Sequence, residues 1–131
     1  NITNNSVQGC EEYGIDVGLR CIVRGNTCAF NNKGGILAGG QNTIAENECH
    51  DNDVLTVGGV GVRVTGSRNR VEANNVSDNE IGIDIESSGN IIVRNTASSN
   101  FSVNYNIVGG NDVGTIQSSP VGAGPWDNFE Y

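Results

Sequence analysis

Two carboxylates and a guanidinium are the residues of this chain whose types and spacing first suggest chemistry. Asp84 and Glu86 are two residues apart in a segment that alternates as a strand does, so both side chains are expected on one face. Their carboxylates would lie roughly 7 Å apart, at the lower edge of the range for inverting glycosidases. Arg63 precedes Asp84 by one repeat and is expected to pair with it across roughly 5 Å. Arg63, Asp84 and Glu86 are thus the catalytic candidates, although a surface salt bridge has the same spacing.

A second group of candidates surrounds His50, the only histidine and so the only residue of the type that commonly exchanges protons near neutral pH. Asp51 follows it, and the next segment, 53–59, makes its repeat longer than the others. Insertions of this kind become loops on one face, often the binding face, so we expect a loop that walls a groove for a glycan. A tolerated insertion with an incidental histidine is the alternative. The predicted ligand-binding residues are Leu37, His50, Asp51, Asp53, Arg63 and Asp84.

The same residues offer little to a metal ion. Asp16 lies three repeats from Asp84, roughly 14 Å away, and one calcium ion cannot bind both. The chain has no second histidine and no nearby cysteine pair at the spacing that zinc requires. We therefore predict no metal site and no cofactor from the residues themselves.

All of these candidates are positioned by a repeat. An asparagine recurs at steps of 21, 21, 27 and 21 residues, flanked three residues before and two residues after by small or apolar side chains. The three columns are Asn5, Asn26, Asn47, Asn74 and Asn95; Ile2, Val23, Ile44, Val71 and Ile92; and Val7, Cys28, Cys49, Val76 and Ala97. A fixed period in this range marks a protein built by stacking one structural unit.

The unit consists of short strands. Each repeat contains a run such as Gly61-Val-Arg-Val or Gly82-Ile-Asp-Ile, which alternates in the strand manner and is too rich in Gly and β-branched residues for a helix. Stacked strands about 4.8 Å apart place equivalent residues in ladders, so the apolar columns become a continuous core. The asparagines are expected at the corners, in the left-handed backbone region, with amides that bond from coil to coil.

The coil Φ-x-x-Asn-x-Φ-x-x-Asn…Gly-Ile-x-Val resembles that of the right-handed parallel β-helix repeat proteins with the pectin-lyase-like fold. It stands clearly in Ile92-Ile-Val-Arg-Asn95 and in Asn79-Glu-Ile-Gly-Ile-Asp-Ile85. The resemblance implies an all-β, right-handed, single-stranded parallel β-helix of about five coils. Its enzymes project their active groups outward from one sheet, which directs attention to the column of Asp16, Leu37, Arg63 and Asp84. Its lyases use a basic residue near calcium-bound carboxylates, which implies such a role for Arg63 and makes Ca²⁺ the one cofactor that the resemblance suggests.

The resemblance implies several functions, because the family includes polysaccharide lyases, glycoside hydrolases, uronate epimerases, phage tailspikes and non-catalytic domains. The glycosidase pattern of Asn-Thr-Asp, paired Asp-Asp, Gly-His-Gly and Arg-Ile-Lys is absent, as is the Tyr-Gly-x-Asp-Pro-His signature of the epimerases. We therefore expect a non-catalytic or catalytically incomplete module of an extracellular carbohydrate-associated protein that contacts polysaccharide. The alternatives are a lyase, hydrolase or epimerase acting on polyuronate, and a structural spacer or assembly domain.

Charge narrows the possible partners. The formal net charge is −8, from 15 acidic and 7 basic residues, and nucleic-acid binding requires clustered Lys and Arg instead. No apolar run reaches the length of a membrane span. An acidic, Asn-rich composition fits a secreted or cell-surface protein of a bacterium.

The period divides the chain into coils over residues 1–106 and a tail over 107–131. The tail contains Trp126, Phe129 and Tyr131, which would suit a cap folded over the last coil. Docking of a partner or a sugar is the alternative. The chain begins in register at Asn1, so further N-terminal coils or another subunit are expected to cover that end.

Four cysteines leave the redox state open. Cys28 and Cys49 are one period apart in an apolar column, where packing alone accounts for them and a disulfide is also possible. Cys10 and Cys21 occupy corner positions held elsewhere by Asn, and the sequence does not pair them.

Overall fold

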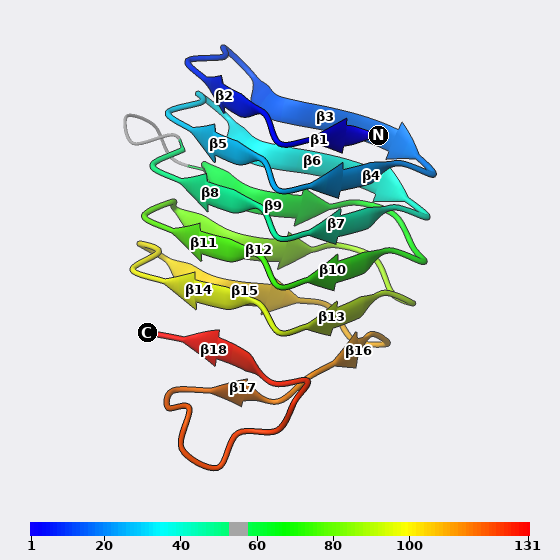
Figure 1. Ribbon diagram of the computed structural model, residues 1–131, viewed down its shortest axis with the longest axis vertical. Helices are drawn as coiled ribbons and strands as arrows, with labels where there is room; N and C mark the ends of the chain where they lie inside the picture. The colour runs from blue at the N-terminus through cyan, green and yellow to red at the C-terminus, as the bar shows by residue number, and fades with distance from the viewer. Residues whose placement is uncertain (53–57) are drawn as a thin grey trace.

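The chain is a right-handed parallel β-helix in a computed structural model that describes residues 1–52 and 58–131. Within these residues the chain forms eighteen strands and no helix, and every strand pairing is parallel. Among the described residues there is accordingly no helix long and apolar enough to cross a membrane. Figure 1 shows the coils stacked along one axis, with the N-terminal coil at one end and β17 at the other. The fold class predicted from the repeat is confirmed.

Three sheets run along the stack; each of the first five coils contributes one strand to each sheet, and the tail adds one strand to sheet A and two to sheet B. Sheet A contains β1 (Ile2–Thr3), β4 (Ile22–Arg24), β7 (Thr43–Ala45), β10 (Arg70–Glu72), β13 (Ile91–Val93) and β16 (Asp112–Val113). Sheet B contains β2 (Ser6–Gln8), β5 (Thr27–Ala29), β8 (Glu48–His50), β11 (Asn75–Ser77), β14 (Thr96–Ser98), β18 (Asn128–Glu130) and β17 (Ile116–Gln117). Sheet C contains β3 (Tyr13–Leu19), β6 (Gly34–Gly40), β9 (Val60–Val64), β12 (Ile81–Ile85) and β15 (Val103–Ile107).

The predicted apolar columns form the core. Val23 pairs with Ile2 and with Ile44, and Cys28 pairs with Val7 and with Cys49, so each column continues from coil to coil. From the second coil onward the members of both columns are fully buried. Because each side chain packs on its counterpart in the next coil, removal of apolar surface from water stabilises the whole stack.

Asparagine ladders hold the corners together. In the first ladder, the backbone N–H and the side-chain Nδ2 of Asn26 both donate to Oδ1 of Asn47, at 3.0 and 2.9 Å. Asn47 donates in the same way to Asn74. The second ladder runs through Asn31, Asn52, Asn79 and Asn100, and the third through Asn42, Asn69, Asn90 and Asn111. Each rung therefore satisfies a buried main-chain donor that no strand pairs.

The sequence predicted that the asparagine at each corner takes the left-handed backbone conformation. In the structure the residue before the asparagine takes it instead. The first-ladder residues Asn26 and Asn74 are preceded by Gly25 and Ala73, whose φ angles are 66° and 54°. The same holds for the other ladder asparagines up to Asn111, and side chains as different as Phe30 and Glu46 occupy this position. The physical reason is that the asparagine amide must point inward to bond its neighbours, so the preceding residue makes the turn.

The tail adds strands to the stack. β16 extends sheet A, β18 pairs with β14 in sheet B, and β17 pairs with β18. Asn128 of the tail supplies the last rung of the first ladder, because it accepts from Asn95 at 3.0 Å. Among the three tail aromatics, Trp126 and Tyr131 are largely exposed. The aromatic that packs against the core at this end is Tyr105 of β15, whose hydroxyl lies 2.9 Å from each of the carbonyl oxygens of Asn95 and Phe129 and can donate to either.

Cys28 and Cys49 pair in register and are fully buried, and the structure contains them as free thiols. The Cys49 thiol donates a hydrogen bond to the sulfur of Cys28, and this bond together with the burial of the side chain raises the pKa of Cys49 well above its usual value. Cys10 and Cys21 are only half-buried. Because a reagent must reach the sulfur, the buried pair and the half-buried pair should differ in their accessibility to thiol reagents.

We expect a thiol reagent to modify Cys10 and Cys21 in the folded protein and to reach Cys28 and Cys49 only after unfolding. Mass spectrometry of the native and urea-unfolded protein, labelled with a maleimide, measures this directly. Labelling of all four thiols in the native state would contradict the packing described here. A pair of unlabelled cysteines after unfolding would instead identify the disulfide that the spacing allows.

Candidate functional site

The outward face of sheet C gathers the predicted catalytic residues around one guanidinium. Nε of Arg63 lies 3.0 Å from Oδ2 of Asp84 and 3.3 Å from Oε1 of Glu86. Arg63 and Asp84 occupy equivalent positions of β9 and β12, and Glu86 follows β12 by one residue. The pairing predicted from the one-repeat spacing is present.

Two further residues, which the sequence did not single out, complete this network. Nδ2 of Asn106 donates to the second oxygen of Asp84 at 2.8 Å, and Nη1 of Arg63 donates to the hydroxyl of Tyr13 at 3.0 Å. Asn106 is in register with Asp84 on β15, so the strand periodicity would have found it. Tyr13 begins β3 in the first coil and spans the second coil to reach Arg63, a contact that no one-repeat spacing indicates.

A glycine makes the Tyr13 contact possible. Gly34 stands in register with Tyr13 on the next coil, and a Cβ on Gly34 would lie 2.6 Å from Cε1 of the tyrosine ring. The ring therefore crosses the bare backbone of the second coil. Burial lowers the pKa of Arg63, but Tyr13, Asp84 and Glu86 raise it, and the net pKa is above the usual value. The guanidinium is held as a cation between its partners.

The network restricts the chemistry that Asp84 and Glu86 can perform. Asp84 is 3% exposed, and both of its oxygens accept hydrogen bonds. Because Oδ2 of Asp84 and Oε1 of Glu86 contact the same nitrogen of Arg63, these two oxygens are closer than the ~6.5–9.5 Å by which inverting glycosidases separate their carboxyl groups. The guanidinium also occupies the space between them where a glycosidic oxygen would have to enter. The arrangement is suited to a fixed polar surface rather than to acid and base exchange.

The remaining members of the column continue the same face. Leu37 is in register with Arg63 on one side and with Asp16 on the other, and it is half-buried. Asp16 is exposed. Beside this column lie Gly18 and Gly39, so the face is flat next to the polar network.

His50 and Asp51 lie elsewhere. His50 belongs to β8 of sheet B, its Nδ1 is 2.9 Å from Oδ2 of Asp51, and the ring of Phe30 meets the imidazole edge-on at 6.1 Å between centroids. No contact joins this group to Leu37 or Arg63 within the described part of the chain. Asp53 and most of the predicted loop 53–59 lie outside the described residues. The residues expected to line one groove therefore lie in two separate groups, His50 and Asp51 at sheet B and Leu37, Arg63 and Asp84 on sheet C.

Within residues 1–52 and 58–131, no group of three or more His, Cys, Asp or Glu side chains is arranged to hold a metal ion.

Comparison with known families matches residues 1–120 to the family described as the right handed beta helix region. Searches against curated proteins and against solved structures return no match.

Proposed function

Because this chain belongs to the right-handed β-helix family, we propose that it is a non-catalytic β-helix module of an extracellular, carbohydrate-associated protein, and that the outward face of sheet C contacts polysaccharide. The observation that carries the proposal is the network centred on Arg63. Its charged groups are bonded to one another, which supports a binding surface over a catalytic centre.

The face of sheet C has the properties of a glycan platform. The buried Asp84 fixes the polar groups of Arg63 and Asn106 on adjacent coils, Arg63 also holds the hydroxyl of Tyr13, and Glu86 remains about half exposed. A polymer of sugar units presents hydroxyl groups at regular intervals, and a rigid ladder of donors and acceptors loses little side-chain entropy on binding them. The flat strip at Gly18 and Gly39 admits a ring beside the network.

Affinity gel electrophoresis tests the proposal with neutral and acidic polysaccharides cast in the gel. The test variant replaces both Arg63 and Asp84 by alanine, because removing both charges leaves neither one buried without a partner. The matched control replaces Arg24 and Glu46 by alanine, an exposed ion pair between adjacent coils away from sheet C. We expect retardation of the wild type and the control by at least one polysaccharide and about fivefold weaker retardation of the test variant. Absence of retardation by every polysaccharide would reject the function.

An enzyme acting on polyuronate is the second candidate, favoured by the convergence of Asp84 and Glu86 on a single cation. This candidate predicts product release from polyuronate that is lost in Asp84→Asn. Ultraviolet absorbance of unsaturated products, measured with calcium present, identifies a lyase. A reducing-sugar assay identifies a hydrolase.

A further inference from the structure

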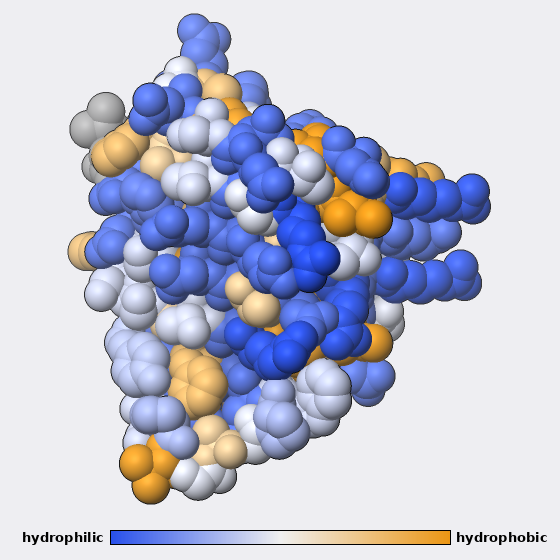
Figure 2. All heavy atoms as spheres, in the orientation of Figure 1, coloured by the Kyte–Doolittle hydropathy of each residue, from blue (hydrophilic) through white to orange (hydrophobic). Residues whose placement is uncertain are grey.

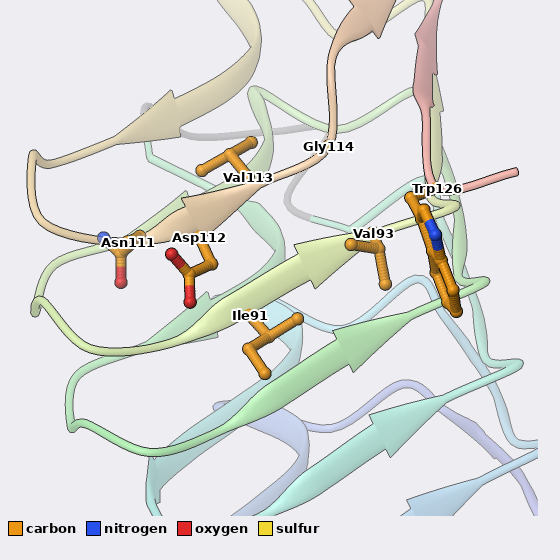
Figure 3. A pocket seen from close by; sticks show the side chains of 7 residues that line it. All are labelled: Ile91, Val93, Asn111, Asp112, Val113, Gly114 and Trp126. Atoms are coloured by element: carbon orange, nitrogen blue, oxygen red, sulfur yellow. The ribbon is translucent and has the colours of Figure 1, made fainter. Parts of the chain in front are cut away.

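A hollow of about 450 Å³ lies on a different face, where the tail meets sheet A. It is lined by Ile91, Val93, Asn111, Asp112, Val113, Gly114 and Trp126. Figure 3 shows Ile91 and Val93 side by side on β13, Asp112 on the neighbouring strand β16, and the indole of Trp126 beyond Val93. Figure 2, which shows the side of sheets A and B, is hydrophilic over most of its area, with hydrophobic atoms in small groups. An aromatic and two aliphatic side chains around one hollow are thus unusual on this surface.

The indole is available to a ligand and is held in place. Trp126 is 55% exposed. The guanidinium of Arg94 lies over its ring at 5.6 Å and also pairs with Glu72. Arg94 does not line the hollow, so the indole faces the hollow with a surface that Arg94 leaves open. A cation fixed over one part of an aromatic ring orients the rest without blocking it.

One of the lining side chains carries a charge. Asp112 is exposed, and among the described residues no hydrogen bond or ion pair involves its carboxylate. The neighbouring Asn111 amide is occupied, because it accepts from Asn90 and donates to the carbonyl of Val108. The hollow therefore offers one apolar wall and one acceptor group with two open oxygens.

The geometry points to a binding site for a neutral pyranose unit of a glycan, with its C–H face against Trp126 and neighbouring hydroxyls donating to Asp112. This inference rests on the proposed function and names the class of sugar. A hydroxyl bonded to a carboxylate forms a charge-assisted hydrogen bond, which two adjacent hydroxyls of one ring can make together. The volume is within the range of small-molecule sites.

The same carboxylate discriminates against other occupants. A uronate would place a second negative charge beside Asp112 on a protein of net charge −8. An apolar peptide would remove the carboxylate from water without offering a hydrogen bond, which is costly. Of these three occupants, the neutral sugar is the one that satisfies both the aromatic wall and the free acceptor.

Trp126 is the only tryptophan, so its fluorescence reports on this hollow directly. The probes are cellotetraose, mannotetraose, xylotetraose and tetragalacturonate, titrated into the full chain. We expect a saturable emission change with at least one neutral probe, none with tetragalacturonate, and about tenfold weaker binding of the neutral probe to Asp112→Asn. Asp78→Asn, the same change of charge at an exposed corner, should bind as the wild type does.

The outcomes separate this site from the face of sheet C. Retardation of the protein by polysaccharide, with unchanged Trp126 emission and no effect of Asp112→Asn, would overturn the inference and leave the proposed function standing. Binding that survives in the Arg63→Ala, Asp84→Ala variant but weakens in Asp112→Asn would support the hollow and reject sheet C as the contact. Tetragalacturonate binding as tightly as the neutral probes, or no response to any of the four, would also overturn the inference.

Discussion

Replacing Asn47 by alanine is expected to lower the free energy of unfolding by about 4 kcal/mol, a large part of the stability of a domain this size. The Asn47 side chain is buried in the middle of the first ladder. Its Oδ1 accepts from the backbone N–H and from Nδ2 of Asn26, and its Nδ2 donates to the carbonyl of Val23 and to Oδ1 of Asn74. Alanine leaves the N–H of Asn26 without an acceptor inside the protein, in addition to the void left by the amide.

The same ladder provides the control, because Asn5 occupies the equivalent position in the first coil. Asn5 is exposed, and its side chain only donates, to Asn26 and to the carbonyl of Thr3. Its backbone N–H still donates to Asn26 when the side chain is removed. Urea unfolding followed by circular dichroism should therefore show a loss below about 1 kcal/mol for Asn5→Ala. If Asn5→Ala and Asn47→Ala lowered the free energy of unfolding equally, the hydrogen bonds of the ladder would not be what stabilises the corner.

The sequence predicted the core and the ladders because both repeat. In a parallel β-helix the environment of a residue recurs at each coil, so a column such as Val23, Ile44 and Val71 keeps its apolar character along the chain. The left-handed residue before each asparagine cannot be recognised in this way, because its residue type varies from coil to coil. A left-handed φ is held at Phe30 and at Ala73, residue types that do not by themselves mark a turn.

The candidate site was predictable only where it follows the repeat. Arg63 and Asp84 are 21 residues apart and on adjacent strands, so their contact follows from the period. Tyr13 lies 50 residues before Arg63 and reaches it across Gly34, which depends on the length of one side chain. The hollow depends on the return of the irregular tail, which brings Trp126 into the lining together with Ile91 and places β18 beside β14. No periodicity in the sequence describes that return.

Replacing Gly61 by alanine is expected to destabilise the protein by about 3 kcal/mol, through overpacking. Gly61 belongs to the glycine column that begins the strands of sheet C, at the point where the chain passes the second asparagine ladder. A Cβ at this position would lie 2.2 Å from Cγ1 of Val76, 2.9 Å from Nδ2 of Asn79 and 2.9 Å from the carbonyl oxygen of Gly82. Val76 is a fully buried core residue and Asn79 is a ladder rung, so neither has space into which it can move.

Gly18→Ala is the matched control for Gly61→Ala, because it makes the same substitution in the same sheet. A Cβ on Gly18 would meet no atom within 4 Å, and its backbone is not left-handed. We therefore expect Gly18→Ala to change the free energy of unfolding by no more than about 0.5 kcal/mol, with any gain coming from a less flexible unfolded chain. Thermal and urea unfolding of the two variants measure the difference. If Gly61→Ala unfolded at the same urea concentration as Gly18→Ala, the close approach of sheet C to the ladder would be wrong. Glycine would then occupy this column only because of its backbone conformation. The packing instead predicts that the column lacks the space for the Cβ of alanine.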